Sequence, residues 1–249
     1  MKFNKFIDKL SRKLTHQHLI AIIIILTVAI IAVVGIARRN GGPADAGDPT
    51  GASAGPSSGK PPMVVIDAGH GGWEPGAGNG SINEKDVVLA ISLEIEKQLK
   101  EKNIDYYMIR TDDTYVSLED RAKIANEKKG RLFISIHNNS FTDPSQGGIL
   151  TAYNPYSPIG EDIARIMQSK ISDIGMRDRD IMPRPNLYVL RHTEMPSLLL
   201  EIGFISNKND LKLLTDSDFQ QKCALSIVDG IEEILARYVI GEEENPEAN

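Results

Sequence analysis

From Met63 onward, short apolar runs alternate with longer segments whose apolar residues recur every three or four positions. Strands are expected at 63–67, 105–110, 132–136, 147–153, 186–191 and 197–204, and helices at 84–100, 117–129, 159–171 and 216–240. Several of the strand-like runs are apolar almost throughout, which is typical of strands buried on both faces. The alternation therefore predicts an α/β domain over 63–240, with three layers and a mostly parallel central sheet flanked by helices.

Two of the expected helices carry further local signals. Ser117 stands three residues before Asp120, a pattern typical of a capped helix start. In the last helix, Phe219, Cys223 and Ile227 lie on one apolar stripe, which indicates packing against a core. Cys223 is the chain's one cysteine, so an intramolecular disulfide is impossible, and we expect a small buried hydrophobic residue.

Residues 19–37, ahead of this domain, form an apolar run without a charged side chain. As a helix the run would be about 28 Å long, close to the ~30 Å hydrocarbon core of a bilayer. Five basic residues precede it and two follow it, so the positive-inside rule places 1–18 in the cytosol and the remainder outside. We expect a transmembrane signal anchor in the cell membrane. The alternative is a cleaved signal peptide, which would release a secreted protein.

The segments that flank the expected domain have the composition of unfolded chain. Residues 38–62 are rich in Gly, Pro and Ser and predict a flexible linker with a reach of roughly 25–30 Å. Residues 241–249 predict a polar, acidic and frayed tail.

Charge excludes some classes of partner. Residues 1–39 hold seven basic residues and one acidic residue, which leaves 21 basic and 33 acidic residues and a net charge of −12 for 40–249. Such a body is unsuited to nucleic acid, where neutralisation of phosphates dominates affinity. Other anionic polymers would have to bind through a local basic patch.

Four polar residues are expected at the ends of strands or helices on one side of the sheet. His70 follows the first strand, His137 follows the strand 132–136, Glu201 closes an apolar strand, and Glu84 opens a helix. Because loops at the carboxyl ends of parallel strands share one edge, these four side chains should converge there. The loop 69–83 holds six glycines and one proline, which suits a sharply folded backbone.

Two imidazoles and a carboxylate form one of the recurrent ligand sets of catalytic zinc. We therefore predict one Zn²⁺ held by His70, Glu84 and His137. Zinc lowers the pKa of bound water towards ~7, which permits hydrolysis at neutral pH. Glu201 is the expected catalytic residue: it would carry a proton from water to a leaving amine, and desolvation should raise its pKa.

Simpler roles compete for several residues. Glu84 could be a helix-start carboxylate favoured by the macrodipole. His192 is expected at the surface, with substrate contact as the alternative. Asp67 would either orient a ligand histidine or only cap the turn. Trp73 and Tyr153 are either packing residues or platforms for substrate.

The blocks around these residues resemble the zinc-dependent N-acetylmuramoyl-L-alanine amidases, a family of bacterial cell-wall hydrolases. The resemblance covers about residues 63–240 and rests on VVIDAGHGGWEPGA, INEKDVVLAISLEIEKQL, RTDDTYVSLEDRAKIAN, LFISIHNNSF and LYVLRHTEMPSLLLEIGFISNKND, in this order. It implies zinc at His70, Glu84 and His137, with Glu201 as the catalytic carboxylate. It also implies the substrate, which is the amide between the lactyl group of N-acetylmuramic acid and L-alanine in peptidoglycan.

Further expectations follow from the resemblance. Ala68 and Asn138 depart from the family pattern, and neither is expected to touch a ligand. Some relatives carry a helix that plugs the site, but only residues 138–148 separate His137 from the next strand, so we expect an open cleft. The expected partners are peptidoglycan and, through the anchor, the membrane; no nucleic acid is expected, and the catalytic domain is expected to be monomeric. Growth, cell separation and spore-wall formation are all compatible occasions.

Two other functions fit the same residues. An inactive amidase-like protein could bind peptidoglycan and recruit other factors. A metallopeptidase or a deacetylase could act on the same polymer, because a zinc ion held by two histidines and a glutamate does not choose between amides.

Overall fold

The computed structural model describes residues 53–54 and 63–238. Its main sheet has seven strands in the order β1-β5-β2-β6-β9-β7-β8. Strands β5, β2, β6 and β9 run parallel to one another, whereas β7 is antiparallel to β9 and β8 is parallel to β7. The predicted, mostly parallel central sheet is confirmed. The strands are β1 (Ser53–Ala54), β2 (Val64–Ala68), β5 (Tyr106–Met108), β6 (Phe133–Asn139), β7 (Ile149–Tyr153), β8 (Asp178–Pro183) and β9 (Ser197–Phe204).

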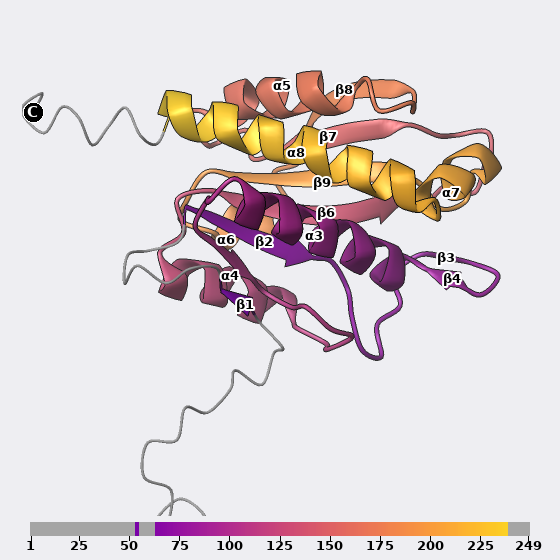
Figure 1. Ribbon diagram of the computed structural model, residues 1–249, viewed down its shortest axis with the longest axis horizontal. Coiled ribbons are helices and arrows are strands. Elements are labelled where there is room, and N and C mark those ends of the chain that lie inside the picture. The colour runs from indigo at the N-terminus through magenta and orange to yellow at the C-terminus, as the bar shows by residue number, and fades with distance from the viewer. Residues whose placement is uncertain (1–52, 55–62, 239–249) are drawn as a thin grey trace, which may run out of the picture. The chain divides into compact units, whose positions relative to one another are not determined.

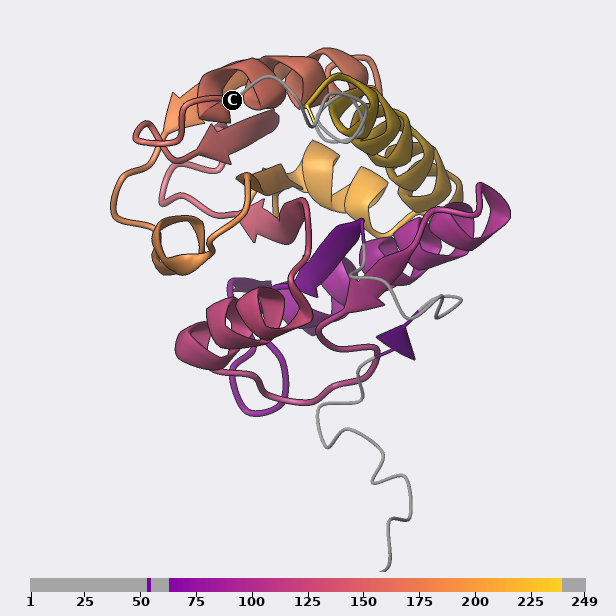
Figure 2. The ribbon, with the colours of Figure 1, turned by 90° about the vertical axis from the view of Figure 1, so that its left-hand side faces the viewer.

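Helices cover both faces of this sheet, as the three-layer prediction requires. Helices α3, α5 and α8 pack on one face, and α4 and α6 pack on the other (Figure 1, Figure 2). Figure 1 shows α3 and α8 side by side over the central strands, and α7 adjoins α8 and β9. The helices are α3 (Glu84–Glu101), α4 (Leu118–Lys128), α5 (Gly160–Ile171), α6 (Tyr188–His192), α7 (Lys208–Leu214) and α8 (Ser217–Tyr238).

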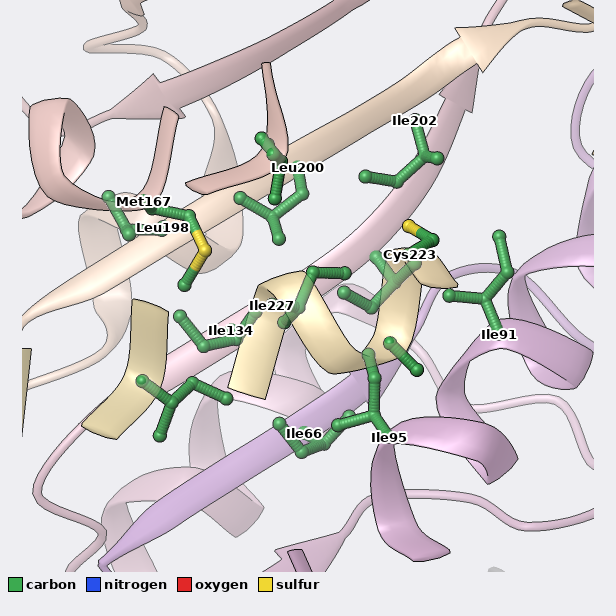
Figure 3. Packing of buried hydrophobic residues seen from close by; sticks show 14 of the residues in the cluster. Ile66, Ile91, Ile95, Ile134, Met167, Leu198, Leu200, Ile202, Cys223 and Ile227 are labelled. Carbon is green, nitrogen blue, oxygen red and sulfur yellow. The ribbon is translucent and has the colours of Figure 1, made fainter. Parts of the chain in front are cut away.

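The core between the sheet and α3, α5 and α8 is apolar (Figure 3). Ile91 and Ile95 of α3 meet Ile227 of α8 above Ile66 of β2, and all four side chains are fully buried. Each such side chain contributes roughly 1.5–3 kcal/mol relative to full exposure. Cys223 is also fully buried, and burial raises the pKa of its thiol to about 12. Its predicted role as a small core residue is confirmed.

Helix α4 begins as the sequence predicts. The Ser117 hydroxyl accepts a hydrogen bond from the Asp120 backbone N–H at 3.0 Å and donates one to the Asp120 carboxylate at 2.8 Å. This cap satisfies one of the backbone donors that the first turn leaves without a partner. The cap also fixes the start of the helix that carries Arg121, whose side chain reaches the site described below.

The predicted strand at 186–191 is wrong, because Tyr188–His192 form the short helix α6. Leucine, tyrosine and valine in this run favour a strand on composition. In the fold, Val189 and Leu190 are buried in the second apolar cluster, which a single helical turn achieves. One turn is too short to display a helical period in the sequence.

Several elements of the structure have no predicted counterpart. Strand β8 lies at the edge of the sheet, and its sequence DRDIMP contains charged residues that obscure a strand pattern. Helix α7 spans only seven residues. A small hairpin, β3 (Gly78–Asn79) with β4 (Ile82–Asn83), lies within the glycine-rich loop.

Most of the flanking segments lie outside the described residues. These are the expected cytosolic segment 1–18, the expected anchor 19–37, the linker 38–62 apart from 53–54, and the tail 241–249. Ser53 and Ala54 pair with Met108 and Tyr107 of β5 in antiparallel register. Within 53–54 and 63–238, no helix combines the length and the apolar character of a membrane span.

Candidate metal centre

The structure brings His70, Glu84 and His137 together. Glu84 Oε1 lies 3.1 Å from His70 Nε2 and 2.9 Å from His137 Nδ1. One donor atom from each of the three residues lies within 4.8 Å of the other two. The two imidazole rings meet edge to face, with centroids 4.9 Å apart. Three side chains of types that ligate metals, drawn from a stretch that runs from residue 70 to residue 137, therefore meet at one point in the fold.

Each of these side chains comes from a different element. His70 stands two residues beyond β2, Glu84 is the first residue of α3, and His137 belongs to β6. His137 and Glu201 lie inside their strands, which continue to Asn139 and Phe204, so the expectation that they close their strands is wrong. The extra strand length is irregular, because the register between β6 and β9 shifts just beyond His137.

The backbone register fixes the relation between His137 and Glu201. The two residues are direct partners in the parallel pairing of β6 with β9. Side chains alternate between faces along a strand, so both project to the face that also carries Phe133 and Leu199, opposite the large apolar core. The site therefore opens on the side of the sheet that α4 and α6 cover.

Glu84 is held in its ionised form. Its side chain is almost fully buried, and its two oxygens accept hydrogen bonds from the backbone N–H groups of Ala77 at 2.9 Å and Asn138 at 3.0 Å. Burial alone would raise the pKa of Glu84, but hydrogen bonds with His137 and His70 outweigh burial and hold that pKa well below its ordinary value. The main chain of Asn138 thus touches a ligand, contrary to expectation.

Opposing effects also act on the pKa of His137. Burial would lower the pKa of its imidazole, but the hydrogen bond with Glu84 and the charges of the nearby carboxylates together outweigh this effect and raise the pKa. Two imidazoles and the buried, ionised carboxylate between them form a donor set that suits a divalent cation. The described residues therefore fit a metal ion.

Glu201 lies beside this group. Its Oε2 atom is buried and has no hydrogen-bond partner among the described residues. Burial raises the pKa of Glu201, as the sequence predicts, although the neighbouring His137 acts in the opposite direction. An orphaned buried carboxylate oxygen requires a polar group such as a water molecule or a substrate N–H. The side chain is therefore available to exchange a proton.

These residues line a pocket of about 320 Å³. His70 and His137 keep about a fifth of their side-chain surface exposed, at 20% and 19%. The segment between β6 and β7 contains no helix, so the prediction that no helix from this segment plugs the site is confirmed. The other walls of the pocket come from Leu118, Leu187, Tyr188, Val189 and Leu199.

Two positions in the first loop must be glycine, because other side chains lie where a Cβ atom would be. A Cβ atom on Gly69 would lie 2.4 Å from the His137 ring, and one on Gly76 would lie 2.6 Å from Glu84 Oε2 and from the His70 ring. His70 itself has φ of 58°, a conformation that L residues adopt at a cost of order 1–3 kcal/mol unless the surroundings enforce it. The loop is thus shaped around the ligands.

Two buried arginines enforce this shape, and neither is a predicted site residue. Arg110 donates to the carbonyls of Ala68 and Gly69 at 2.8 and 2.7 Å. Arg121 donates to the carbonyls of Ala68 and His70 at 2.7 and 2.6 Å and pairs with Asp67. Both side chains lie within the quoted block RTDDTYVSLEDRAKIAN, but an arginine in a polar run resembles a surface residue.

Asp67 neither caps the turn nor contacts a ligand histidine directly. Its carboxylate accepts hydrogen bonds from Arg121 and from the Ser135 hydroxyl, the latter at 2.7 Å, and not from a ligand histidine. Burial would raise the pKa of Asp67, but the Arg121 charge and the hydrogen bonds from Ser135 and Arg121, with the charge of His137, together outweigh burial and lower the pKa. Asp67 therefore acts on the metal centre through Arg121 and the His70 carbonyl.

The remaining candidates separate clearly. His192 is exposed, stacks on Tyr188 and does not belong to the metal group. Tyr153 is buried and packs in the core. Trp73 is 75% exposed and lies against the Tyr115 ring, with ring centroids 4.5 Å apart, so it is not a core residue.

Known proteins resemble this chain over the same region. A family model described as N-acetylmuramoyl-L-alanine amidase matches residues 64–233. YqiI of Bacillus subtilis, whose function is uncharacterised, is 37% identical over 188 residues, which cover 74% of this chain and 89% of YqiI. The probable cell wall amidase LytH of Staphylococcus aureus is 33% identical over 171 residues, or 68% of this chain and 56% of LytH.

Solved structures also resemble this chain. The catalytic domain of CwlV, an N-acetylmuramoyl-L-alanine amidase of Bacillus (Paenibacillus) polymyxa var. colistinus, is 37% identical with a TM-score of 0.67, covering 70% of this chain and 97% of that one. An N-acetylmuramoyl-L-alanine amidase of Clostridium difficile 630 is 35% identical with the same TM-score and coverage. The family model spans more than half of the chain and includes His70, Glu84, His137 and Glu201. The chain therefore belongs to the N-acetylmuramoyl-L-alanine amidase family.

Proposed function

We propose that the chain hydrolyses the amide between N-acetylmuramic acid and L-alanine in peptidoglycan with a zinc ion held by His70, Glu84 and His137, and with Glu201 as its catalytic residue. The observation that carries this proposal is the convergence of three ligating atoms within 4.8 Å of one another. Glu201, with a buried oxygen that lacks a partner, lies beside them. Family membership supplies the bond that is cleaved.

The protein contributes a fixed and charged donor set. Zinc, when bound, supplies Lewis acidity and lowers the pKa of water towards ~7. The Glu84 carboxylate, whose pKa is held low by the two histidines, also accepts hydrogen bonds from the backbone N–H groups of Ala77 and Asn138, so its charge is available without a change in protonation. Arg121 holds the His70 carbonyl, Arg110 holds the two carbonyls just before it, and backbone pairing holds the main chain of His137, so the donor set is organised before substrate binds.

Glu201 moves the proton in this proposal. It takes a proton from the attacking water and delivers it to the alanine nitrogen as the amide C–N bond breaks. A raised pKa brings its carboxyl closer to neutral pH, where a group can both accept and donate efficiently. The pairing with His137 keeps this carboxyl next to the metal ligands.

We also propose that residues 19–37 anchor the protein in the cell membrane and that 38–62 link the anchor to a catalytic domain on the outer side. The uninterrupted apolar run and its basic amino-terminal flank support this placement. Full-length protein should sediment with membranes, and its domain should be digested by protease added outside spheroplasts. A shortened chain in the culture medium would favour the cleaved, secreted alternative.

A complete donor set within one chain supports a monomeric catalytic domain. Light scattering of the detergent-solubilised protein should give one chain per micelle. A dimer at micromolar concentration would contradict this part of the proposal.

The activity can be tested with purified peptidoglycan and the full-length protein. Zinc should be present in about a one-to-one ratio, a chelator should abolish release of peptides, and added zinc should restore it. Mass spectrometry of the products should show a free lactyl carboxylate on the glycan and a free alanine amine on the peptide. His192→Ala is a matched control, since His192 lies outside the metal group and should be dispensable.

The same assay separates the other functions. Cleavage within the stem peptide would identify a metallopeptidase, and loss of acetyl groups from the glycan would identify a deacetylase. Binding of peptidoglycan by a zinc-loaded protein without any new chain ends would identify an inactive recruiting protein. Each of these results would contradict the proposed amidase reaction.

A further inference from the structure

A second hollow adjoins the metal pocket on the same face of the sheet. It measures about 210 Å³ and lies over β7 and β8, and we call it the β8 groove. Asn139 lines both the groove and the metal pocket. Leu150, in the floor of the groove, is the direct antiparallel partner of Glu201. The groove therefore begins one strand away from the proposed proton carrier.

The charge of the β8 groove is opposite to that of the protein. Arg179 and Arg184 line it, together with the apolar side chains of Phe141, Met182 and Phe204, and no carboxylate is among its lining residues in the described part of the chain. The body of the protein from residue 40 carries a net charge of −12. An anion would be repelled by most of this surface and attracted to this groove.

The two arginines differ in how firmly they are held. Arg179 is half-buried, donates to Gln146 Oε1 at 3.3 Å and to the Gly147 carbonyl at 3.2 Å, and lies over the Phe204 ring at 5.2 Å. The Arg184 guanidinium is exposed and makes no hydrogen bond or ion pair with a described residue. Arg184 is also close enough for its charge to lower the pKa of Glu201 against the effect of burial. The groove thus offers one oriented and one free guanidinium.

The reaction releases a product whose chemistry matches this lining. The peptide leaving group carries free carboxylates beyond its first alanine, on its acidic residues and at its carboxyl end. Guanidinium groups bind carboxylates through paired N–H donors, and they do so more strongly where apolar neighbours reduce competition from water. The glycan half of the substrate carries fewer such groups, so the peptide half fits the groove better.

We propose that the β8 groove is the subsite for the stem peptide, with Arg184 and Arg179 binding its carboxylates while the scissile amide lies at the metal centre. This proposal rests on the proposed amidase function. It assigns the two sides of the metal centre: the peptide extends over β9, β7 and β8, and the glycan lies towards the opposite, His70 side.

The test measures binding of peptide without turnover. The probe is the synthetic tripeptide L-alanyl-γ-D-glutamyl-L-lysine, with free carboxylates or with both carboxylates converted to amides, titrated calorimetrically into the detergent-solubilised full-length protein. The free-acid peptide should bind more tightly than the amidated one. Arg184→Met should weaken binding of the free acid about tenfold, as expected for loss of one charged hydrogen-bonded contact. Its binding of the amidated peptide should be unchanged.

Two further variants serve as controls. Arg165→Met is the matched control, since Arg165 is exposed on α5 and pairs with Glu161; it should bind both peptides as wild type does. Arg184→Lys should recover part of the affinity for the free acid. In the cleavage assay, Arg184→Met should raise KM for muramoyl tripeptide with free carboxylates and leave kcat nearly unchanged.

The proposal is overturned if wild type binds the free-acid and amidated peptides equally or not at all, or if Arg184→Met binds the free acid as wild type does. An equal loss for both peptides would also overturn it, because it would indicate a general structural effect. Since the tripeptide binds without being cleaved, these outcomes are independent of whether the amidase reaction is observed.

Discussion

The two faces of the central sheet share the same strands but carry different kinds of residue. Towards α3, α5 and α8, strands β2, β6 and β9 present apolar side chains such as Ile66, Ile134 and Leu200. Towards α4 and α6, the alternate positions of the same strands include Asp67, Ser135, His137 and Glu201. A two-residue period along each strand thus separates the packed core from the chemistry.

This separation implies that the two faces respond differently to substitution. Changes on the apolar face towards α3, α5 and α8 should affect the free energy of unfolding and leave the chemistry of folded molecules intact. Changes at polar positions on the other face should affect catalysis, except where a buried ion pair holds the backbone. The five predictions below test this division, from the largest expected effect to the smallest.

Glu201→Gln should lower kcat by about 10²–10⁴-fold, because it removes the group that transfers the proton. Zinc content should equal that of wild type, and the Tm should not fall, because a buried carboxyl with a raised pKa is replaced by a neutral amide. Product release from peptidoglycan and metal analysis check these outcomes together. Wild-type turnover by a zinc-loaded variant would exclude Glu201 from the mechanism.

Arg121→Met should lower the free energy of unfolding by about 3–5 kcal/mol, because it leaves Asp67 buried without its partner. It should also reduce zinc affinity, since Arg121 holds the His70 carbonyl. Denaturant unfolding and a zinc titration measure the two effects. Unchanged zinc affinity would show that the ion pair stabilises the fold without positioning the ligand.

The same ion pair should respond to pH. The pKa of Asp67 in the fold lies below its unfolded value of about 3.9. Its contribution to stability is therefore fully present above that value and is lost as pH falls through the folded pKa. The difference in unfolding free energy between wild type and Asp67→Asn should shrink as pH drops below about 4. A difference that is constant down to low pH would contradict the lowered pKa.

Ile227→Ala should cost about 2–5 kcal/mol of stability, as expected for truncation of a fully buried aliphatic side chain. Ile227 lies on the face opposite the metal centre, so kcat and KM at a temperature where the variant is folded should match wild type. Chemical unfolding and steady-state kinetics provide the measurements. A large change in kcat would show that the two faces are coupled.

Ser117→Ala should cost about 0.5–2 kcal/mol, the usual effect of removing an N-cap side chain. Since α4 carries Arg121, a small decrease in zinc affinity should accompany the loss. Ser117→Asp, which retains a capping acceptor, is the control and should recover most of the stability. Equal destabilisation by both substitutions would indicate that the cap is not the cause.

The periodic parts of the fold could be predicted from the sequence, because burial leaves a regular apolar pattern. The sheet and the long helices followed from such patterns, and the convergence of His70, Glu84 and His137 followed from their expected positions at the ends of elements. The short helix at Tyr188–His192 could not be predicted, because one turn has no period and its residue types favour a strand. Strand β8 was missed because an edge strand tolerates charged residues.

Within the site, the arginines were the main omission. Arg110 and Arg121 can be buried because main-chain carbonyls of the His70 loop and, for Arg121, the Asp67 carboxylate accept from their donors, and sequence patterns do not reveal such partners. Similarly, the β8 groove combines residues of β6, β7, β8, β9 and two loops, which become neighbours only in the folded sheet.

The pairing of His137 with Glu201 in adjacent parallel strands has a consequence for how this active site can fail and evolve. Backbone pairing allows only discrete spacings between the two side chains, because a slip of one residue would turn one of them to the other face of the sheet. The distance between the His137 and Glu201 side chains therefore cannot change gradually, either on heating or through successive substitutions. We expect activity to persist almost unchanged up to the cooperative unfolding of the sheet and then to vanish in one step.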